Sequence, residues 1–276
     1  MNDLSVVERR LAAFFERNER ILVITGAGCS TASGIGDYRD AEGEWKRAAP
    51  VQMQDFVASD AMRRRYWARS MHGWPSFRKA EPNAAHKALA ELERRGWIHG
   101  LITQNVDGLH QRAGQRAVIE LHGSLQWVVC LDCYRRVSRA ALQRWLEAEN
   151  GFVLEASATL APDGDADLVV KDLSSFRVPH CSGCGGILKP DVVFYGDAVP
   201  RSRVDEAYAR VDAADAMLVV GSSLMVFSSY RFLKRGRERG MTMAAVNRGR
   251  TRADDWLDFK VDDDCAAVLS RLVDRN

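Results

Sequence analysis

Residues 21–39, with the sequence ILVITGAGCSTASGIGDYR, constrain the fold more than any other part of the chain. The stretch opens with four apolar residues that run into a glycine-rich turn, which is typical of a buried parallel strand. Gly26 and Gly28 let the backbone turn sharply and approach a ligand closely, and small residues that open a helix after a strand direct N–H groups at a phosphate. The stretch therefore indicates a nucleotide site, although a tight turn in which Asp37 and Arg39 are only solvated is the alternative.

The glycine spacing departs from the usual dinucleotide fingerprint. Gly26 and Gly28 match its first two glycines, but Thr31 stands where the third would be. No acidic residue that would close a second strand follows about twenty residues later. A dinucleotide bound here would therefore be held differently from one in a dehydrogenase.

Length, charge and the N-terminal sequence restrict the possible functions. A chain of 276 residues can bury a full core in one large or two unequal domains. The net charge of +2 argues against a dedicated nucleic-acid binder. The opening MNDLSVVERRL has neither a secretory nor a transit signature, and no apolar run reaches the roughly 18 residues of a membrane span. We expect a cytoplasmic protein with no nucleic-acid or membrane partner.

Helix and strand patterns alternate through most of the chain, which is typical of a mainly parallel sheet covered on both faces. The expected strands are 21–24, 98–103, 118–121, 216–220, 243–246 and 259–261, and the expected helices are 4–19, 81–96, 202–213, 224–237 and a closing helix. We therefore predict an α/β fold with a Rossmann-like, doubly wound parallel sheet.

Two stretches interrupt this alternation. Residues 40–80 mix aromatic residues and charges without a strand signal, so we expect short helices and loops that form a small lobe or lid. Residues from 127 to 194 hold two Cys-x-x-Cys pairs and an acidic loop, so we expect a smaller inserted module. The predicted division is a main domain of 1–40, 81–126 and 195–276, a helical lobe of 41–80 and a small domain of 127–194.

The two Cys-x-x-Cys pairs are the strongest local chemical signal. Two intervening residues let both sulfurs of a pair reach one tetrahedral ion, and two such turns supply the four thiolates of a closed structural zinc site. The ligands would be Cys130, Cys133, Cys181 and Cys184. Two redox dithiols or simply buried cysteines are the alternatives. Four protein ligands leave no open position, so the ion would organise structure and take no part in catalysis.

Polar side chains follow two of the expected strands, at the ends where doubly wound sheets bind ligands. His122 ends one strand, and its imidazole titrates near neutral pH, which suits a general base. A histidine satisfied within a turn fits this position as well. Gln104, Asn105 and Asp107 follow another strand and offer amides and a carboxylate to a ribose or a carboxamide, or else to turn and cap chemistry.

These stretches together resemble one family. The chain contains, in the order found in sirtuins, GAGCSTASGIGDYR, TQNVDGLH, ELHGS, the two Cys-x-x-Cys pairs, LKPDVVFYGDAVP, VVGSSLMVFSS and AVNRG. The resemblance spans about residues 20–265. Two further stretches, RRRYWARSMHGWPSF and GDYRDAEGEWKR, look closest to the class II sirtuins.

The resemblance implies an NAD-dependent protein-lysine deacylase that releases nicotinamide and 2′-O-acyl-ADP-ribose. NAD would lie between the Rossmann-like domain and the zinc domain, and an acyl-lysine peptide would enter the same cleft as an added strand. Catalysis would fall to His122, as general base on the ribose hydroxyls, and to Asn105. A protein mono-ADP-ribosyltransferase and a weakly catalytic NAD or ADP-ribose sensor are the alternatives.

The resemblance also carries binding roles onto individual positions of this sequence. NAD contacts are implied for Gly26, Ala27, Gly28, Ser30, Asp37, Tyr38, Arg39, Gln104, Asn105, Asp107, Gly221, Ser222, Ser223, Asn247, Arg248, Gly249 and Cys265. Contacts with the substrate peptide are implied for Val193, Phe194 and Tyr195.

Two positions add detail to the resemblance. Gly36 replaces the proline usual in the cofactor-binding loop, so ordering this loop should cost up to about 1 kcal/mol more. Tyr66 and Arg69 have the Tyr-x-x-Arg spacing that grips a carboxylate in sirtuins that remove acidic acyl groups, and residues three apart share one helix face. We expect acyl chains of the glutaryl type to be accepted; a packed tyrosine beside a solvated arginine is the alternative.

Overall fold

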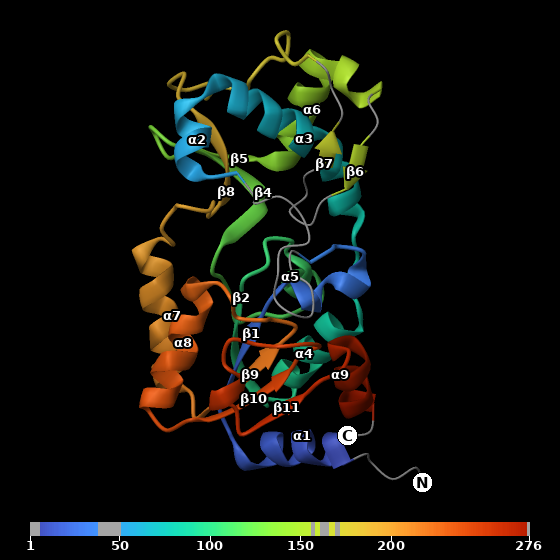
Figure 1. Ribbon diagram of the computed structural model, residues 1–276, viewed down its shortest axis with the longest axis vertical. Helices are drawn as coiled ribbons and strands as arrows, with labels where there is room; N and C mark the ends of the chain where they lie inside the picture. The colour runs from blue at the N-terminus through green and yellow to red at the C-terminus, as the bar shows by residue number, and fades with distance from the viewer. Residues whose placement is uncertain (1–5, 38–50, 156–157, 161–165, 169–171, 275–276) are drawn as a thin grey trace.

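The computed structural model describes residues 6–37, 51–155, 158–160, 166–168 and 172–274. They form two lobes, one built on a six-stranded sheet and the other on small antiparallel sheets and helices (Figure 1). Within the described ranges, none of the helices combines the length and the apolar character needed to cross a membrane.

The large sheet has the strand order β11-β10-β9-β1-β2-β3, and all of its strands are parallel. The strands are β1 (Ile21–Thr25), β2 (Ile98–Thr103), β3 (Val118–Glu120), β9 (Ala216–Val220), β10 (Thr242–Val246) and β11 (Phe259–Val261). Strands β1 and β9 are neighbours in the centre, so the strand order reverses between them. This is the topological switch point beyond which doubly wound sheets bind their ligands, and the predicted fold class is confirmed.

Helices cover both faces of the large sheet. They are α1 (Val6–Arg17), α4 (Ala84–Arg94) and α9 (Cys265–Asp274) on one face, and α7 (Arg201–Ala213) and α8 (Phe227–Glu238) on the other. In β1, Ile21 and Val23 belong to the hydrophobic cluster of the first face, whereas Leu22 and Ile24 belong to that of the second. Successive side chains of a strand alternate between faces, so a continuous apolar run is stable only where both faces are buried.

The second lobe joins the two segments that interrupt the α/β alternation. Its elements are α2 (Met53–Ala58), α3 (Asp60–Lys79), β4 (Gly123–Cys130), β5 (Arg136–Ser138), α6 (Arg139–Asn150), the 3-10 helix η3 (Gly151–Glu155), β6 (Ala158–Leu160), β7 (Ala166–Leu168) and β8 (Leu188–Val192). Phe56 and Trp67 share one hydrophobic cluster with Val128, Leu146 and Leu188. The helical segment and the cysteine-bearing segment therefore pack around a common core.

Buried Arg139 ties α6 to α3. Its guanidinium lies 5.7 Å from the ring centroid of Trp67 and 4.9 Å from that of Trp74, and it donates to Ser70 O at 3.1 Å and to Gln143 Oε1 at 2.7 Å. Burial lowers the pKa of Arg139 to about 10, so it remains charged at neutral pH. A planar guanidinium can stack on rings and donate in several directions at once, which a lysine cannot do. Helix α3 runs for 20 residues where short helices were expected, and Arg139 contacts three of its residues.

Candidate active site

A cavity of about 490 Å³ opens beyond the carboxyl ends of β1 and β9, at the switch point of the sheet. Twelve of the positions predicted to contact NAD line it: Gly26, Ala27, Gly28, Asp37, Gln104, Asn105, Gly221, Ser222, Ser223, Asn247, Arg248 and Cys265. His122 and Tyr195 also line it. The fold therefore brings candidate positions from seven separate stretches of the chain into one site.

The remaining candidates lie elsewhere. Ser30 and Asp107 are buried next to the cavity wall, and Tyr38 and Arg39 lie outside the described residues. Gly249 is half-buried in the turn after β10 and is not among the described lining residues. Sequence reasoning missed several lining residues: Thr31, Leu224, Met225, Val226, Arg250, Asp263 and Asp264. Thr31, Leu224, Met225 and Val226 lie inside motifs already quoted for the resemblance, and the other three lie within two residues of a predicted contact. Their places in or beside these motifs were the signal that could have found them.

The glycines of the site serve first to bring two turns together. A Cβ on Gly221 would lie 2.3 Å from the N atom of Cys29, and a Cβ on Gly28 would lie 3.0 Å from the O atom of Gly221. Gly221 also has a φ of +58°, in the left-handed region that glycine tolerates best. The turn after β1 and the turn after β9 thus touch backbone to backbone, in addition to leaving room for a ligand.

Replacing Gly221 by Ala is expected to lower the free energy of unfolding by at least about 2 kcal/mol and to weaken NAD binding, because the new Cβ forces the two turns apart. Gly240→Ala is the matched control: Gly240 has a φ of +66°, but a Cβ there would meet nothing within 4 Å. Urea unfolding and calorimetric titration with NAD would measure both effects. Equal losses in the two variants would show that backbone strain alone, and not the packing of the turns, matters.

A buried hydrogen-bonded chain fixes the turn after β1 to the turn after β2. Ser30 Oγ donates to Asp107 Oδ2 at 2.7 Å, and Asn105 Nδ2 donates to Ser30 Oγ at 3.1 Å and to Gly26 O at 2.9 Å. Burial raises the pKa of Asp107, while hydrogen bonds from Leu109 N and from Ser30 oppose that rise. The predicted contacts Ser30 and Asp107 therefore support the cavity wall from behind.

The start of α4 anchors the same turn. Asn83 Oδ1 accepts from the N–H of Ala85 at 2.8 Å and so caps the helix, while Asn83 Nδ2 donates to Cys29 O at 2.9 Å and to Ser33 Oγ at 3.0 Å. The N–H of Asn83 donates to Nδ1 of His86 at 3.3 Å, which completes a capping box. Asn83 therefore caps α4 and also binds the glycine-rich turn, so the start of the helix fixes the position of the turn.

A second group of possible metal donors lies under this turn. Donor atoms of Cys29, His86 and His110 lie within 4.8 Å of one another. Both ring nitrogens of His86 already have protein partners, Asn83 N at 3.3 Å and Ser30 Oγ at 3.4 Å. Burial lowers the pKa of His86 to about 4 and that of His110 well below its usual value. Neutral imidazole rings, one of them with a protein partner at each nitrogen, are typical of a buried polar cluster in the core.

His122 follows β3 and is held at both ring nitrogens. Nδ1 lies 3.0 Å from the main-chain O of Gln104, and Nε2 lies 2.7 Å from Ser228 Oγ. A carbonyl only accepts hydrogen bonds, so Nδ1 carries the proton and Nε2 keeps its lone pair. Burial lowers the pKa of His122 to about 4; the Gln104 carbonyl opposes this shift and Arg203 adds to it. The imidazole is therefore neutral at pH 7 and can accept a proton at Nε2.

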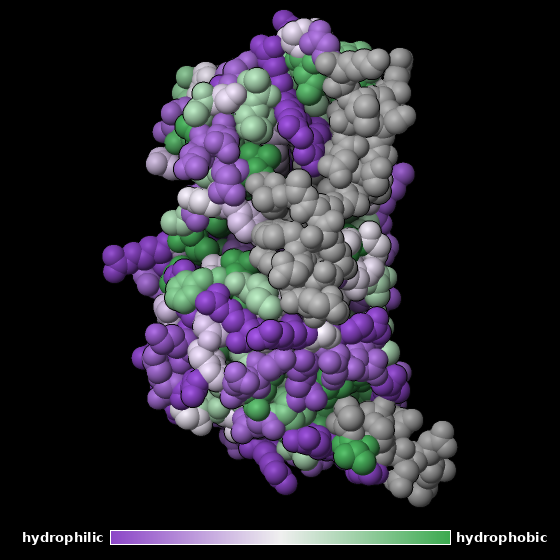
Figure 2. Space-filling model, in the orientation of Figure 1, coloured by the Kyte–Doolittle hydropathy of each residue, from purple (hydrophilic) through white to green (hydrophobic). Residues whose placement is uncertain are grey.

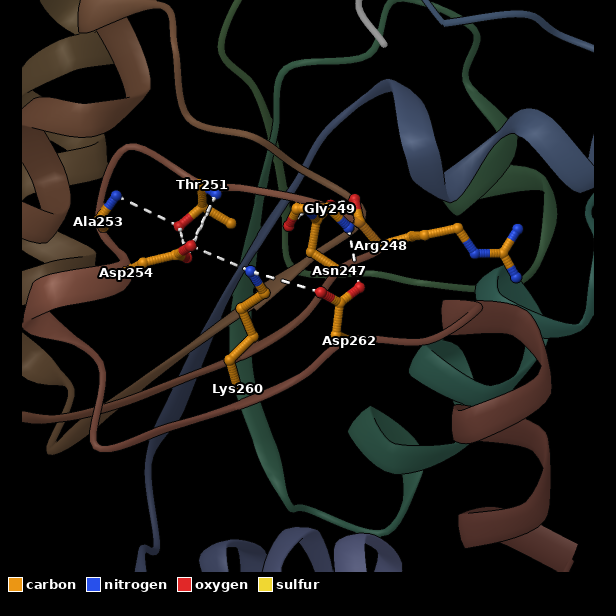
Figure 3. A network of polar contacts seen from close by, with 8 residues as sticks. All are labelled: Asn247, Arg248, Gly249, Thr251, Ala253, Asp254, Lys260 and Asp262. Carbon is orange, nitrogen blue, oxygen red and sulfur yellow. Dashed lines mark hydrogen bonds and ion pairs between the residues drawn. The ribbon is translucent and has the colours of Figure 1, made fainter. Parts of the chain in front are cut away.

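The turn after β10 closes the far end of the cavity through a network of charged and polar groups (Figure 3). Asn247 Nδ2 donates to the main-chain O atoms of the next two residues, at 2.9 and 3.2 Å. The N–H of Gly249 donates to Asp262 Oδ1 at 2.9 Å, and Lys260 Nζ lies 3.9 Å from Asp262 and 3.0 Å from Asp254. The turn is therefore held in shape by Asn247, which lines the cavity, and by Asp254, Lys260 and Asp262, which are not among the described lining residues.

The four predicted metal ligands meet in the second lobe. One donor atom each of Cys130, Cys133, Cys181 and Cys184 lies within 4.8 Å of the others. Sγ of Cys130 is 3.5 Å from that of Cys184, and Sγ of Cys133 is 3.7 Å from that of Cys181. The N–H of Gly183, followed by that of Cys184, lowers the pKa of the Cys181 thiol to about 6. Four sulfur donors at these distances fit one tetrahedral zinc ion.

The segment 193–195, expected to pair with a substrate, runs along the junction of the lobes. The N–H of Val193 donates to the main-chain O of His122 at 2.8 Å, and the side chain of Tyr195 lines the cavity. The O atom of Tyr195 accepts from the N–H of Met53 at 2.8 Å. On the face shown in Figure 2, apolar side chains gather where the lobes meet, and hydrophilic ones cover most of the large-sheet lobe.

Tyr66 and Arg69 of α3 are not among the described residues that line the cavity. Tyr66 is buried, and its ring centroid lies 5.3 Å from those of Phe56 and Phe194. Arg69 is half-buried on the next turn of the same helix. Phe194 therefore links Tyr66 to the segment that borders the cavity.

Fold and site together define an α/β protein with a nucleotide-type cavity at its switch point and a four-cysteine lobe beside it. A model of the Sir2 family matches residues 26–228. The chain is 54% identical over 262 residues to an NAD-dependent protein deacetylase of Xanthomonas campestris pv. campestris (strain 8004), covering 95% of this chain and 89% of the relative. It is 54% identical over 273 residues to one of Bordetella bronchiseptica, covering 99% and 98%. The chain belongs to the Sir2 family, the sirtuins.

More distant relatives extend this comparison. The chain is 47% identical over 264 residues to the NAD-dependent protein lipoamidase sirtuin-4, mitochondrial, of Bos taurus, covering 95% of this chain and 84% of that protein. A solved complex of Sir2 with a p53 peptide and NAD+ superposes with a TM-score of 0.79 at 28% identity, covering 96% of this chain and 97% of the other.

Proposed function

We propose that the cavity beyond β1 and β9 is where this NAD-dependent protein deacetylase binds NAD and transfers to it the acyl group of a lysine side chain. The relatives that share 54% identity over nearly the whole chain are NAD-dependent protein deacetylases. One observation carries the proposal: neutral His122 and two glycine-rich turns line a single cavity at the switch point of the sheet.

We assign the ends of NAD from the chemistry of the cavity walls. The turns at 26–28 and 221–223 offer main-chain N–H groups and serine hydroxyls to the phosphates. Asn247, Arg248 and Gly249 would hold the adenine ribose, with Cys265 close to the adenine. Asp37, Gln104 and Asn105 would surround the nicotinamide ribose, supported from behind by Ser30 and Asp107. Tyr38 and Arg39 would also contact the nicotinamide ribose.

His122 is the general base in this proposal. The acyl oxygen of the substrate would attack the ribose carbon of NAD as nicotinamide leaves. A ribose hydroxyl would then attack the acyl carbon, the lysine amine would leave, and a water molecule would supply the oxygen that restores the carbonyl group. His122 Nε2 takes the proton of a ribose hydroxyl, and the Gln104 carbonyl stabilises the resulting imidazolium through Nδ1–H. Asn105 orients the reacting ribose. The products are nicotinamide, 2′-O-acyl-ADP-ribose and free lysine.

The acyl-lysine peptide would enter as an extra strand beside residues 193–195. The Sir2 complex with a p53 peptide and NAD+ supports a peptide site in a protein of this fold. The cysteines at 130, 133, 181 and 184 would hold a structural zinc ion, which lends rigidity to the lobe on the far side of the cleft. We propose a main domain of 1–40, 81–126 and 195–276, beside a second lobe in which the helical part at 41–80 and the zinc-binding part at 127–194 share one core.

We infer further that the protein is a class II sirtuin that accepts acidic acyl chains. The identity of 47% with sirtuin-4 of Bos taurus supports the class. Tyr66 and Arg69 lie one turn apart on α3, and Tyr66 packs on Phe194, which precedes the cavity-lining Tyr195. An arginine close to this junction would pair with a carboxylate at the end of a glutaryl chain.

Arg69→Ala is therefore expected to lower kcat/KM for a glutaryl-lysine peptide by about 10- to 100-fold, because a charge-assisted hydrogen bond is worth roughly 1.5–3 kcal/mol. Turnover of the matching acetyl-lysine peptide should change by less than about three-fold. Arg65→Ala, an exposed arginine of the same helix, is the control. An equal loss of turnover of the glutaryl-lysine and acetyl-lysine peptides in Arg69→Ala would contradict the proposed acyl preference.

An acyl-lysine peptide panel with NAD tests the function itself. Nicotinamide release that depends on the acyl peptide, with 2′-O-acyl-ADP-ribose found by mass spectrometry, is the expected result. ADP-ribosylated protein without this product would instead indicate a mono-ADP-ribosyltransferase. Binding of NAD without turnover would indicate a sensing module.

A further inference from the structure

The first turn of α8 touches the catalytic machinery at two consecutive serines. Ser228 Oγ lies 2.7 Å from His122 Nε2. Ser229 Oγ donates to Gln104 Oε1 at 2.9 Å, and the main-chain O of Gln104 accepts from His122 Nδ1 at 3.0 Å. Ser228 thus contacts the imidazole directly. Ser229 holds Gln104, whose main-chain carbonyl contacts the other ring nitrogen.

The protonation of His122 dictates what Ser228 does. With Nδ1–H engaged by a carbonyl, neutral Nε2 has only a lone pair, so the Ser228 hydroxyl must donate to it. When Nε2 takes up a proton, the hydroxyl can rotate about its C–O bond and accept a hydrogen bond from Nε2–H. A serine can therefore stabilise both states of the base, which an apolar side chain cannot.

We propose that Ser228 is a positioning residue for the general base: it donates a hydrogen bond to the Nε2 lone pair of neutral His122, and it accepts a hydrogen bond from Nε2–H once the ring is protonated. In the free protein its hydroxyl occupies the bond that a ribose hydroxyl of NAD would make. A bound ribose hydroxyl would displace this hydrogen bond and donate to Nε2. The ribose O–H bond would then break as the proton joins Nε2, and Nε2–H would afterwards donate a hydrogen bond to Ser228 Oγ until a water removes the proton. The proposal rests on the function assigned above to His122.

The surroundings of His122 make such support necessary. The ring is largely enclosed, and the cation that acts on it is Arg203 of α7, which disfavours the imidazolium. Arg203 is itself 3.5 Å from Asp191 of β8, which offsets part of its charge. Across the cavity, Asp37, Arg248, Arg250, Asp263 and Asp264 are the charged residues among the described lining. The Ser228 hydroxyl can reorient to donate or to accept a hydrogen bond, and so it replaces water that the enclosed His122 ring cannot reach.

Ser228→Ala and Ser228→Thr, each in the full-length protein, test the proposal. Ser228→Ala is expected to lower kcat about 10-fold, to change the KM for NAD by less than about two-fold, and to move the acid limb of the kcat profile to lower pH. Ser228→Thr keeps the hydroxyl and should recover kcat to within about three-fold. Ser270→Ala is the control, because Ser270 is a half-buried serine of α9 whose hydroxyl donates to a carbonyl of its own helix, Ala267 O at 3.2 Å.

Nitrogen-15 NMR of the imidazole of His122 gives a readout that needs no turnover. In the wild type Nε2 should be the unprotonated, hydrogen-bonded nitrogen, and in Ser228→Ala its resonance should move toward that of a free lone pair. An Nε2–H tautomer in the wild type, or an Ala variant with unchanged kcat and acid limb, would overturn the role of Ser228. A wild-type protein with the expected tautomer but no deacetylation would refute the proposed function without contradicting the hydrogen bond between Ser228 and His122.

Discussion

His122→Ala is expected to reduce NAD-dependent deacetylation by about 10²- to 10⁴-fold, the usual effect of removing a general base, while NAD binding stays within a few-fold of the wild type. The imidazole contributes one wall of the cavity, whereas the glycine-rich turns that would hold the phosphates rest on contacts with other residues. Product formation followed by mass spectrometry, together with calorimetric titration with NAD, separates the two effects.

The pH dependence of the wild type follows from the same residue. Burial lowers the pKa of His122 to about 4, so the neutral ring is the form present at pH 7. A base must be unprotonated to act, so kcat/KM should be level near neutrality and should fall as the pH drops through about 4. His99→Ala is a suitable control, since His99 lies on β2 and is not among the described residues that line the cavity. Deacetylation that survives His122→Ala would refute the mechanism.

Removal of zinc is expected to have the second largest effect, the loss of the ordered second lobe. Four cysteine sulfurs held within 4.8 Å of one another would repel as thiolates without a cation, and structural zinc sites contribute about 10–16 kcal/mol of folding free energy. A strong chelator, or Cys184→Ser, should abolish activity and expose the segment from β4 to β8 to limited proteolysis. The large-sheet lobe, which has its own two hydrophobic clusters, should remain protected.

Metal analysis decides between zinc and the alternative of two redox dithiols. One zinc ion per chain in the purified protein and a lowered melting temperature after chelation are expected. Ser182→Ala is the matched control, since Ser182 is exposed in the same turn as two of the ligands. A chain that contains no zinc, and whose activity instead depends on the thiol redox state, would favour the dithiols.

Much of the fold could be predicted because its strands are short apolar runs buried on both faces. The strands expected at 98–103, 216–220 and 259–261 have the bounds of β2, β9 and β11. Helix ends were less accurate: a helix expected over 224–237 is α8 at Phe227–Glu238. Helix α8 begins only after residues 224–226, which line the cavity. The conformation of this loop depends on tertiary contacts, and the local sequence does not encode it.

The candidate site could be predicted where a motif marks a strand end, and not where packing alone brings a residue in. His122, Gln104 and the glycines follow strands, so their position was readable. The roles of Ser30 and Asp107 as buried supports, and the contact of Ser228 with His122, depend on how separate turns pack. Nothing near Ser228 in the sequence distinguishes it from other serines at a helix start.

The parallel sheet, the four sulfur ligands and the strand ends that carry polar groups could be read from the chain alone, because hydrophobic period, cysteine spacing and glycine turns are local properties. Which of these groups meet depends on tertiary packing. The close contact of the turns after β1 and β9 leaves no room for a Cβ at Gly221, and the position of α8 places Ser228 Oγ within hydrogen-bond distance of His122 Nε2. Such contacts join residues far apart in the chain, and their geometry is set by packing of the whole core.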